Sequence, residues 1–548
     1  MSEADPSYKR ALARGDLARP FDALVIGSGA GSLTSAALLA LEGRRVLVLE
    51  RHAVPGGCLQ VFKRHGYEWD VGLHYMGEVQ RPNSGLARLF HRVTRGRLAW
   101  APMPEVYNRI VIADRRYDYH AGAEAFKARM KDYFPAEAAA IDRYVALVLA
   151  ANRAAKGYFG ERALPLAMAD ARHAEVAPAF RALSDQTVLQ VLRGLTDNAE
   201  LTAVLCGHYG DYSLPPDQAS FAVHAMVIAH YLDGASFPVG GAARIAETMA
   251  DTVRAAGGLV LVSAEVRQLL LHRQRVVGVV MADGHRLEAP VVISGIGIAQ
   301  TLRLLPSDGA TGGDSAAAAA PAASAAAAAL RQTADAMPLS QCYLALNIGI
   351  EASNAELDMH PANLWIHPSN DLVGNWQRYA AAPRDTPMPL HFISQPSAKD
   401  PSWPDRYPGR STIDICSMTD WRLYEPFAGT GWMKRGAEYA ELKARLTEEM
   451  LAEVYRHYPQ VQGRVAHAEL ATPLSFNHFL NRDRGDFMSF AQTPARFAQR
   501  WMRAHAPVDG LVFSGQDVAA AGVSGAMVGG VIAASAVLGR DLFQGLRG

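Results

Sequence analysis

Residues 21–33 read FDALVIGSGAGSL: an apolar strand runs into three closely spaced glycines and then toward a helix. Gly27 permits a tight turn, and Gly29 lets backbone N–H groups approach a pyrophosphate at the helix start. The third glycine of the usual GxGxxG pattern is replaced by Ser32, which is small enough to be tolerated. Taken alone, the turn is weak evidence for a dinucleotide site, because glycine-rich turns occur wherever a chain bends sharply.

The sequence after the turn strengthens the interpretation. Residues 32–41 are helix formers, Gly43 supplies a stop, and residues 45–50 (RVLVLE) form a second buried strand that ends in an acid. Glu50 lies 23 residues after Gly27, near the spacing at which a carboxylate accepts hydrogen bonds from the ribose hydroxyls of an adenosine without a 2′-phosphate. The pattern predicts a complete βαβ unit and favours FAD or NAD over NADP.

Composition limits the remaining possibilities. The 548 residues are 49% hydrophobic and 20% charged, which is typical of a globular protein with at least two domains. Lys plus Arg and Asp plus Glu number 54 each, so we expect no nucleic-acid partner. The four cysteines form no CxxC pair and no His spacing suits zinc, which predicts a reducing, metal-free protein. The first 20 residues lack the apolar core of a signal peptide, so we expect a cytoplasmic location.

The uncharged run at residues 518–539 has two interpretations. It is long enough to raise the question of a membrane span, and Gly525 and Gly529 form a GxxxG pair. The run is mostly Ala, Gly, Ser and Val, however, and it directly follows the strand-like GLVFSGQD at residues 510–517. We therefore expect a buried helix packed against a sheet.

Four stretches carry a family resemblance. VLVLERHAVPGGCLQVFKRHGYEWDVGLHYMG (46–77) is similar to the segment that follows the nucleotide turn in FAD-dependent phytoene desaturases, carotenoid isomerases and, most closely, retinol saturases. GDYSLPPDQASFAVHAMVIAHYLDGASFPVGG (210–241), PSAKDPSWPDRYPG (396–409) and GLVFSGQDVAAAGVSGAMVGG (510–530) match in the same order, so the resemblance covers nearly the whole chain. It implies that the dinucleotide is FAD.

The resemblance also implies an α/β fold, with a Rossmann-type FAD-binding domain of the phytoene desaturase/amine oxidase kind and a mixed α+β substrate domain. The FAD-binding domain would be discontinuous, comprising residues 21–120, 233–300 and 508–548. Residues 121–232 and 301–507 would form the substrate domain. Within it, the alanine-rich residues 310–329 resemble a linker or loop.

The resemblance assigns FAD contacts as well. The loop at Gly56 and Gly57 would lie along the pyrophosphate and flavin, the backbone of Val266 would pair with adenine, Asp517 would bind the ribityl chain, and the helix beginning near Ser524 would face the flavin. Val266 as a core strand residue and Asp517 as a helix N-cap are the alternatives. The full set of predicted cofactor residues is Gly27, Ser28, Gly29, Ala30, Gly31, Ser32, Glu50, Arg51, Gly56, Gly57, Cys58, Leu59, Val266, Gly515, Asp517, Ser524, Gly525 and Ala526.

Candidate proton donors lie in two matched segments. His74 and Tyr75 fall in GLHYMG (72–77), which resembles the family segment that approaches the flavin, and both side chains can donate the proton that hydride addition to an alkene requires. Tyr212 is a further candidate for the same chemistry. Each of the three has an alternative role as a core residue with its hydrogen bonds satisfied. One departure from the family is DRGDFMSF (483–490), which is less glycine-rich than the corresponding segments.

The flavin motifs alone do not choose between a desaturase, a redox-neutral isomerase and a saturase acting on an apolar polyene or isoprenoid. The similarity to retinol saturases favours the saturase, which is a reductase. A non-enzyme alternative is a prenyl-lipid-binding escort protein of the same general fold. Only one GxG turn of this kind begins a βαβ unit, so electrons would come from free NAD(P)H or from a redox-protein partner.

One helix is a candidate for peripheral membrane association. Residues 84–100 (SGLARLFHRVTRGRLAW) place an apolar face beside a basic one. The apolar face comprises Leu86, Leu89, Phe90 and Val93, and Arg88, His91, Arg92 and Arg95 surround it. An interfacial helix would bind anionic vesicles through Phe90. The alternative is a helix packed on its own domain with a solvated basic side.

Overall fold

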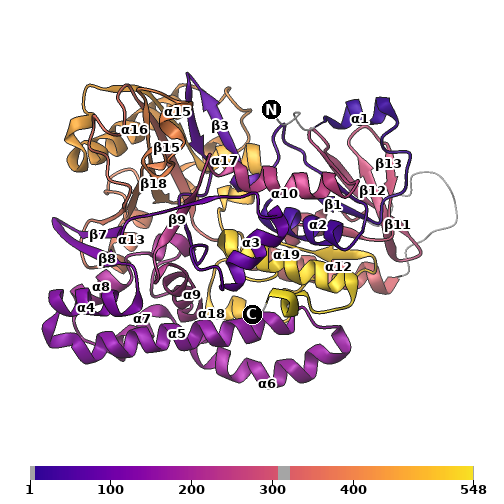
Figure 1. Cartoon of the computed structure of the whole chain (residues 1–548), viewed down its shortest axis with the longest axis horizontal. Helices are drawn as coiled ribbons and strands as arrows, with labels where there is room; N and C mark the ends of the chain where they lie inside the picture. Colours follow the sequence, from indigo (N-terminus) through magenta and orange to yellow (C-terminus); the bar gives the residue numbers. More distant parts are fainter. Residues whose placement is uncertain (1–5, 307–320, 547–548) are drawn as a thin grey trace.

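The computed structural model describes residues 6–306 and 321–546, which form two halves lying side by side (Figure 1). One half is built on five strands, β1 (Ala23–Ile26), β2 (Val46–Leu49), β10 (Leu259–Leu261), β14 (Val292–Ser294) and β20 (Leu511–Phe513). All neighbours are parallel, in the order β10-β2-β1-β14-β20. Three separate parts of the sequence thus contribute to one sheet.

Both β1 and β2 are buried along their whole length, as expected for a parallel sheet covered on its two faces. The helix after β1 is α2 (Ala30–Leu41), which packs against α10 (Ala243–Ala255) and α19 (Gly522–Leu538). A small antiparallel sheet of β11 (Val266–His272), β12 (Arg275–Met281) and β13 (Arg286–Glu288) lies beyond them. The expected βαβ unit and the α/β class are confirmed.

The other half contains a seven-stranded mixed sheet. Its strands are β7 (Val106–Ile112), β8 (Arg115–His120), β15 (Cys342–Ile350), β16 (Asn363–His367), β17 (His391–Ser394), β18 (Ser411–Thr419) and β19 (Val465–Ala471). The order is β19-β15-β18-β17-β16-β7-β8. Within this sheet, as far as the structure describes it, the β16–β7 pair is parallel and the other pairs are antiparallel. The longest ladder joins β15 to β18, whose residues are nearly all buried.

A layer of helices runs along the lower edge of Figure 1. It consists of α4 (Ala123–Tyr133), α5 (Ala138–Glu161), α6 (Leu166–Ser184), α7 (Val188–Arg193), α8 (Ala199–Leu205) and α9 (Phe221–Tyr231). The long helix α5 packs against both α6 and α9. Other described elements are β3 (Val61–Arg64), β4 (Tyr67–Asp70), β5 (Met76–Gly77), α3 (Gly85–Thr94), β6 (Trp100–Pro102), β9 (Ala235–Pro238), α11 (Ile298–Arg303), α14 (Pro396–Lys399) and α17 (Pro473–Leu480).

Two expected boundaries differ from the structure. Residues 106–120 were assigned to the nucleotide-binding domain, yet β7 pairs with β16 in the seven-stranded sheet. In the alanine-rich segment, residues 310–320 lie outside the described residues, but Pro321–Asp335 forms a helix, α12, rather than a linker or loop. Alanine has the highest helix propensity, and α12 packs against α11, which explains the difference.

The interfacial interpretation of residues 84–100 is wrong for this helix. The apolar face of α3 is turned inward: Phe90 is 1% exposed, and its ring lies 5.0 Å from that of Trp100 in an edge-to-face contact. Leu89 and Val93 are buried beside it. The helix therefore packs on its own domain, and its apolar residues are not free to enter a bilayer.

The uncharged run near the C-terminus forms a buried helix, as expected, because α19 packs against α2. No helix in the described part of the chain combines the length and the apolar character that crossing a membrane requires.

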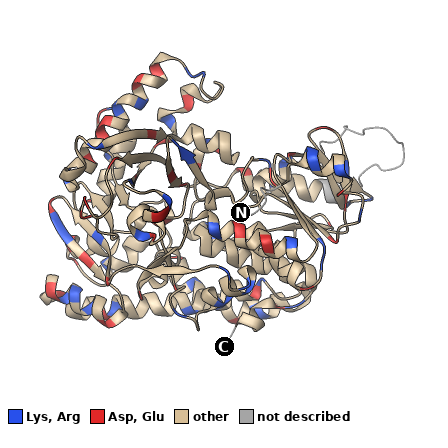
Figure 2. Cartoon of the chain, turned by 45° about the horizontal axis from the view of Figure 1, so that its top comes forward, with Lys and Arg blue, Asp and Glu red and all other residues tan. Residues whose placement is uncertain are grey.

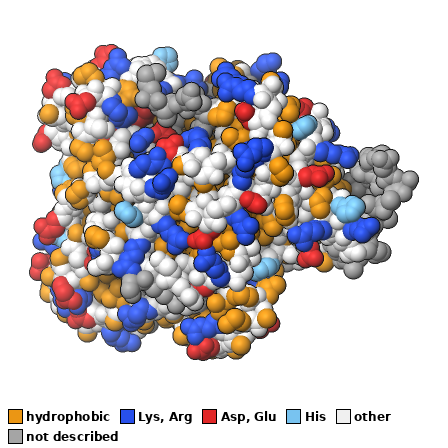
Figure 3. All heavy atoms as spheres, turned by 45° about the vertical axis from the view of Figure 1, so that its right-hand side comes forward, with side chains coloured by type: hydrophobic (Ala, Val, Ile, Leu, Met, Phe, Trp, Pro, Cys, Tyr) orange, Lys and Arg blue, Asp and Glu red, His pale blue; other side chains and the backbone are white. Residues whose placement is uncertain are grey.

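Lys, Arg, Asp and Glu are interspersed along both halves (Figure 2). On the face shown in Figure 3, hydrophobic side chains lie among charged ones of both signs.

Candidate functional site

A cleft of about 260 Å³ lies at the carboxyl ends of β1 and β2, where parallel sheets of this kind bind ligands. Gly27 adopts φ +84°, a conformation that favours glycine. Gly29 caps α2, and a Cβ atom built on it would meet nothing within 4 Å. The turn thus presents backbone N–H groups to open space at a helix N-terminus, as a phosphate site requires.

The same turn holds Glu50, the acid predicted to bind the ribose hydroxyls. Glu50 lines the cleft and accepts hydrogen bonds from the backbone N–H and hydroxyl of Ser28, at 3.0 and 2.6 Å, and from the backbone N–H of His52 at 2.7 Å. The Ser28 hydroxyl in turn accepts from the backbone N–H of Gly56 at 2.8 Å. A carboxylate has about four acceptor positions, so capacity remains for a ribose hydroxyl.

Ser32 is accommodated by a second glycine. A Cβ atom on Gly295, at the end of β14, would lie 2.1 Å from the Ser32 hydroxyl oxygen. The third glycine of the fingerprint normally allows the helix to pack closely on the sheet. Here the neighbouring strand supplies the missing space.

Two other predicted cofactor glycines serve close packing. A Cβ atom on Gly31 would lie 2.5 Å from the Cα atom of Gly515, and one on Gly525 would lie 2.0 Å from the carbonyl oxygen of Ala520. A Cβ atom on Gly530 would lie 2.5 Å from the carbonyl oxygen of Gly31. These contacts let the start of α2, the end of β20 and α19 approach one another beneath the cleft.

Arg482 is a cleft residue that the sequence interpretation missed. Its guanidinium lines the cleft, and Nη1 is buried without a hydrogen-bond partner among the described residues. Asp517 stands nearby with Oδ1 also unpaired, while its Oδ2 accepts from the backbone N–H of Ile298 at 2.8 Å. Asp517 thus caps α11 rather than α19. Unpaired buried polar atoms beside a glycine-lined turn fit an anionic, hydrogen-bonding ligand such as a dinucleotide.

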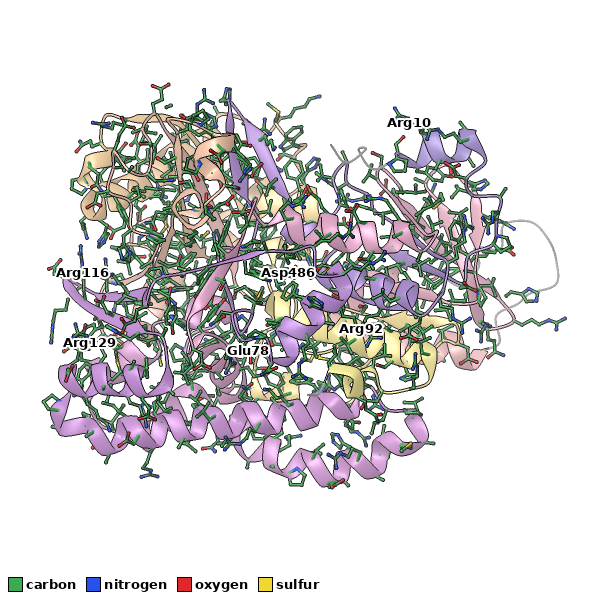
Figure 4. All side chains as sticks on the ribbon, viewed as in Figure 1. Arg10, Glu78, Arg92, Arg116, Arg129 and Asp486 are labelled. Atoms are coloured by element: carbon green, nitrogen blue, oxygen red, sulfur yellow. The ribbon has the colours of Figure 1, made fainter. Side chains whose placement is uncertain are left out.

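Asp486 lies a few residues after Arg482, at the meeting of the two halves (Figure 4). Its carboxyl is buried and has no hydrogen-bond partner among the described residues. Burial raises the pKa of this group to about 6, and the Arg482 charge opposes the rise. From the segment DRGDFMSF, Phe487 and Met488 line the cleft, while Asp486 lies buried next to them in the sequence.

A larger cavity of about 550 Å³ adjoins the cleft. Its walls are mostly apolar and come from α3, α5, α9, the seven-stranded sheet and α19. Leu86, Phe159, Val227, Trp365 and Phe392 are among them. Five residues line both the cleft and the cavity, namely Gly72, Phe487, Met488, Gly522 and Val523. A group bound in the cleft can therefore meet a molecule bound in the cavity.

His74 and Tyr75 both line the cavity, whereas Tyr212 does not. The Tyr212 side chain is fully buried, and its hydroxyl lies 3.3 Å from Nδ1 of His224. Tyr212 is thus a core residue with a satisfied hydroxyl, and the structure gives it no access to a ligand in the cavity. Its neighbour Asp211 lines the cavity instead, 3.2 Å from the Tyr75 hydroxyl. A carboxyl directly before Tyr212, in the same matched segment, was the signal that could have found it.

The predicted cofactor residues divide into three groups. Lining the cleft are Gly27, Ser28, Gly29, Ala30, Gly31, Glu50, Arg51, Gly57, Cys58, Leu59, Val266, Gly515 and Ala526. Ser524 and Gly525 line the larger cavity. Ser32, Gly56 and Asp517 line neither the cleft nor the cavity.

His74 is held as a neutral group. Burial lowers the pKa of His74 to about 3, and the neighbouring Lys399 ammonium adds to the effect. Lys399 is itself buried and donates to the His74 carbonyl oxygen at 2.9 Å and to the Ser394 hydroxyl at 2.6 Å. Burial lowers the pKa of Lys399 to about 7. The lysine therefore fixes the backbone of the GLHYMG segment at the cavity wall.

The fold and the cleft define a protein with a Rossmann-like nucleotide site. The model of an NAD(P)-binding Rossmann-like domain matches residues 25–93. An all-trans-retinol 13,14-reductase of Danio rerio is 32% identical over 540 residues, covering 95% of this chain and 86% of the relative. The chain belongs to this family of reductases.

Two further relatives broaden the picture. A chloroplastic prolycopene isomerase of Arabidopsis thaliana is 25% identical, over 94% of this chain and 83% of the isomerase. A solved structure of wild-type putrescine oxidase bound to putrescine superposes with a TM-score of 0.61, at 16% identity, over 95% of this chain and 100% of the oxidase. The latter shows a shared fold.

Proposed function

We propose that the chain binds FAD in the cleft and reduces a carbon–carbon double bond of an apolar conjugated molecule, a retinoid or carotenoid-like polyene, in the cavity. The observation that carries the proposal is the set of five wall residues shared by the cleft and the cavity. When bound and reduced, the flavin would supply a hydride, which carries both electrons of the reduction. The residues of the chain hold the polyene against it, exclude water and provide the proton.

Several features support FAD as the cofactor. Gly29 and Glu50 provide the phosphate and ribose contacts, and the unpaired Nη1 of Arg482 provides a cation for an acceptor group. The matched domain model is named for NAD(P), but it covers only residues 25–93, which contain the βαβ unit that both dinucleotides use. We expect the purified protein to be yellow and to release FAD on denaturation, identified by chromatography against FAD, FMN and NAD standards. A colourless protein that FAD does not reconstitute would contradict this assignment.

The cavity suits an apolar chain. At about 550 Å³ it falls in the range of about 300–1,000 Å³ that is typical of sites burying a small organic ligand. Its walls are mostly hydrophobic and aromatic side chains, with a minority of polar ones such as Glu78, Lys156 and Asp211. The name of the Danio rerio relative specifies all-trans-retinol as substrate, which makes retinol the first polyene to test.

The direction of the reaction is tested by anaerobic mixing of retinol with protein whose flavin has been chemically reduced. A product heavier by two hydrogens, formed in step with flavin reoxidation, supports the reductase. A product of unchanged mass and altered double-bond geometry would identify an isomerase, the activity named for the Arabidopsis thaliana relative. Loss of two hydrogens from substrate mixed with oxidised protein would identify a desaturase.

Arg482 offers a sharper test of the cleft. Replacing Arg482 with Met removes one charge-assisted hydrogen bond, worth about 1.5–3 kcal/mol, so the FAD dissociation constant should rise by about 10- to 100-fold. The measurement is titration of the apo-protein with FAD, followed by flavin fluorescence. Arg484, which is exposed two residues later, provides the matched control as Arg484→Met. Equal FAD affinity in both variants would exclude a cofactor contact by Arg482.

The electron donor and the location also belong to the proposal. The single βαβ unit supports reduction by free NAD(P)H or by a redox-protein partner, and we expect slow reduction by NAD(P)H alone. A cytoplasmic protein with peripheral access to membranes would reach a lipid-soluble substrate. Since the apolar face of α3 is buried, any such contact uses another surface.

A further inference from the structure

A carboxyl group lies in the wall of the apolar cavity, close to its junction with the cleft. Asp211 belongs to the 3-10 turn Tyr209–Tyr212 and lines the cavity. The Tyr343 hydroxyl holds this turn by donating to the Gly210 carbonyl oxygen at 2.7 Å. The ring of Tyr343 also contacts that of Phe487, a wall residue shared by the two cavities, at 6.1 Å between centroids. The turn that carries Asp211 is thus linked to the junction through the side chains of Tyr343 and Phe487.

A chain of hydrogen bonds ends on this carboxyl. The Lys399 ammonium donates to the side-chain oxygen of Asn363, whose Nδ2 donates to Oδ1 of Asn108 at 2.9 Å. Nδ2 of Asn108 donates to the Tyr75 hydroxyl at 3.4 Å, and that hydroxyl donates to Oδ2 of Asp211 at 3.2 Å. Every donor in the chain points toward Asp211. Such an arrangement stabilises a carboxylate once its proton has left.

Asp211 can also hold a proton at neutral pH. Burial raises the pKa of Asp211 to about 7, and the hydrogen bond from Tyr75 opposes the rise. Among the described residues no cation forms an ion pair with it, although Lys156 lines the same cavity. The titratable groups that interact with it are tyrosines, whose own pKa values burial raises: Tyr75, Tyr107, Tyr212, Tyr231 and Tyr343.

Other cavity groups are less suited to giving up a proton. His74 is neutral, since burial lowers its pKa to about 3. Burial raises the pKa of the Tyr75 phenol, whose proton is already directed to Asp211. Glu78, labelled in Figure 4, interacts with His230, which lowers the pKa of Glu78 and keeps it a carboxylate. A general acid works best when its pKa is near the working pH, a condition that Asp211 meets.

We infer that Asp211 is the general acid of the proposed reduction, giving its proton to one carbon of the double bond while the other carbon takes up hydride. The inference rests on the proposed function. The π bond breaks and two C–H bonds form. A two-electron-reduced flavin is the reductant, and Asp211 is left as a carboxylate that later regains a proton from solvent. Tyr75, at the end of the hydrogen-bond chain, is the positioning residue.

The test compares Asp211→Asn with wild type in single-turnover reduction of retinol by the pre-reduced holoenzyme. Loss of a general acid should slow product formation by about 100-fold or more. In wild type the acid must be protonated, so the rate should be full below pH 7 and fall as pH rises through the pKa of Asp211. Tyr75→Phe removes the bond that lowers this pKa, so its falling limb should move to higher pH. Asp211→Asn should lose the limb.

Two measurements separate chemistry from folding and binding. In the apo-protein, the difference between the infrared spectra of wild type and Asp211→Asn should contain the C=O stretch of one protonated carboxyl that titrates near pH 7, because other buried carboxyls such as Asp486 contribute equally to both spectra. Retinol binding to the apo-protein should stay unchanged in Asp211→Asn. Asp217→Asn, a half-buried aspartate in the same segment that lines neither cavity, should behave as wild type.

The outcomes are distinguishable. An Asp211→Asn holoenzyme with the wild-type rate and pH profile would overturn the inference and leave the proposed function standing. A wild-type protein that forms no product with two added hydrogens would overturn both.

Discussion

The cleft and the cavity are adjacent, but they are built in different ways. The cleft is shaped largely by backbone, in turns where glycines such as Gly27 and Gly29 leave N–H groups accessible. The cavity is shaped by side chains from helices and strands that lie far apart in the sequence. A backbone site can be recognised from a short stretch of residues, whereas a side-chain site exists only after the two halves have assembled.

The largest expected effect concerns the packed core behind the cavity wall. Phe90 is 1% exposed on the same face of α3 that contributes Leu86 and Leu89 to the cavity. Phe90→Ala should lower the free energy of unfolding by about 3–5 kcal/mol, because it leaves a void in a packed core. Chemical denaturation measures the change.

Met433→Ala is the matched control for Phe90→Ala, since Met433 is 80% exposed and its truncation should change stability by less than about 0.5 kcal/mol. A Phe90→Ala protein as stable as this control, with weaker binding to anionic vesicles, would restore the membrane-facing interpretation of α3.

The next effect separates two glycines of the same turn. At Gly31 an added methyl group would meet Gly515 and the Ala526 carbonyl, so Gly31→Ala should cost about 1–3 kcal/mol of stability through overpacking. At Gly29 the added group meets open cleft, so Gly29→Ala should leave the unfolding midpoint of the apo-protein nearly unchanged and weaken FAD binding.

Thermal unfolding and FAD titration of both apo-proteins distinguish these effects. If both variants lost FAD affinity with no loss of stability, Gly31 would be a cofactor contact rather than a packing contact.

The smallest expected effect concerns the departure from the fingerprint. Gly295→Ala should destabilise the protein, because the new methyl group would overlap the Ser32 hydroxyl. In a Ser32→Ala background that overlap disappears, so the two changes should show a coupling free energy of about 0.5–3 kcal/mol. Additive costs in this double-mutant cycle would mean that Gly295 does not accommodate Ser32.

Local sequence was informative for the βαβ unit. The turn, its helix and the acid of Glu50 lie within a short stretch, and their interactions are with one another. The buried character of residues 518–539 could likewise be predicted, because an uncharged run of small residues packs closely. The amphipathic pattern of α3 was ambiguous, since the same pattern serves a bilayer or a protein core.

Sequence analysis missed the site residues that depend on contacts between distant parts of the chain. Arg482 enters the cleft from a segment more than 400 residues after the turn, and Asp211 meets Tyr75 only where α9 and the seven-stranded sheet close on the GLHYMG segment. Sequence analysis named Tyr212 and missed Asp211, because a turn of the 3-10 type decides which of these neighbours faces the cavity and no periodic pattern predicts such a turn. The helix of Pro321–Asp335 was missed because alanine-rich composition was interpreted as a linker.

The five wall residues shared by the cleft and the cavity also bear on the order of assembly. If the cleft holds a dinucleotide, as proposed, that dinucleotide would form part of the cavity wall beside Gly72 and Phe487, and cofactor binding would complete the compartment proposed to receive the apolar molecule. We expect chains made without sufficient cofactor to retain cellular lipid across this junction. Such lipid would delay later reconstitution, and washing the apo-protein with detergent before adding cofactor should speed it.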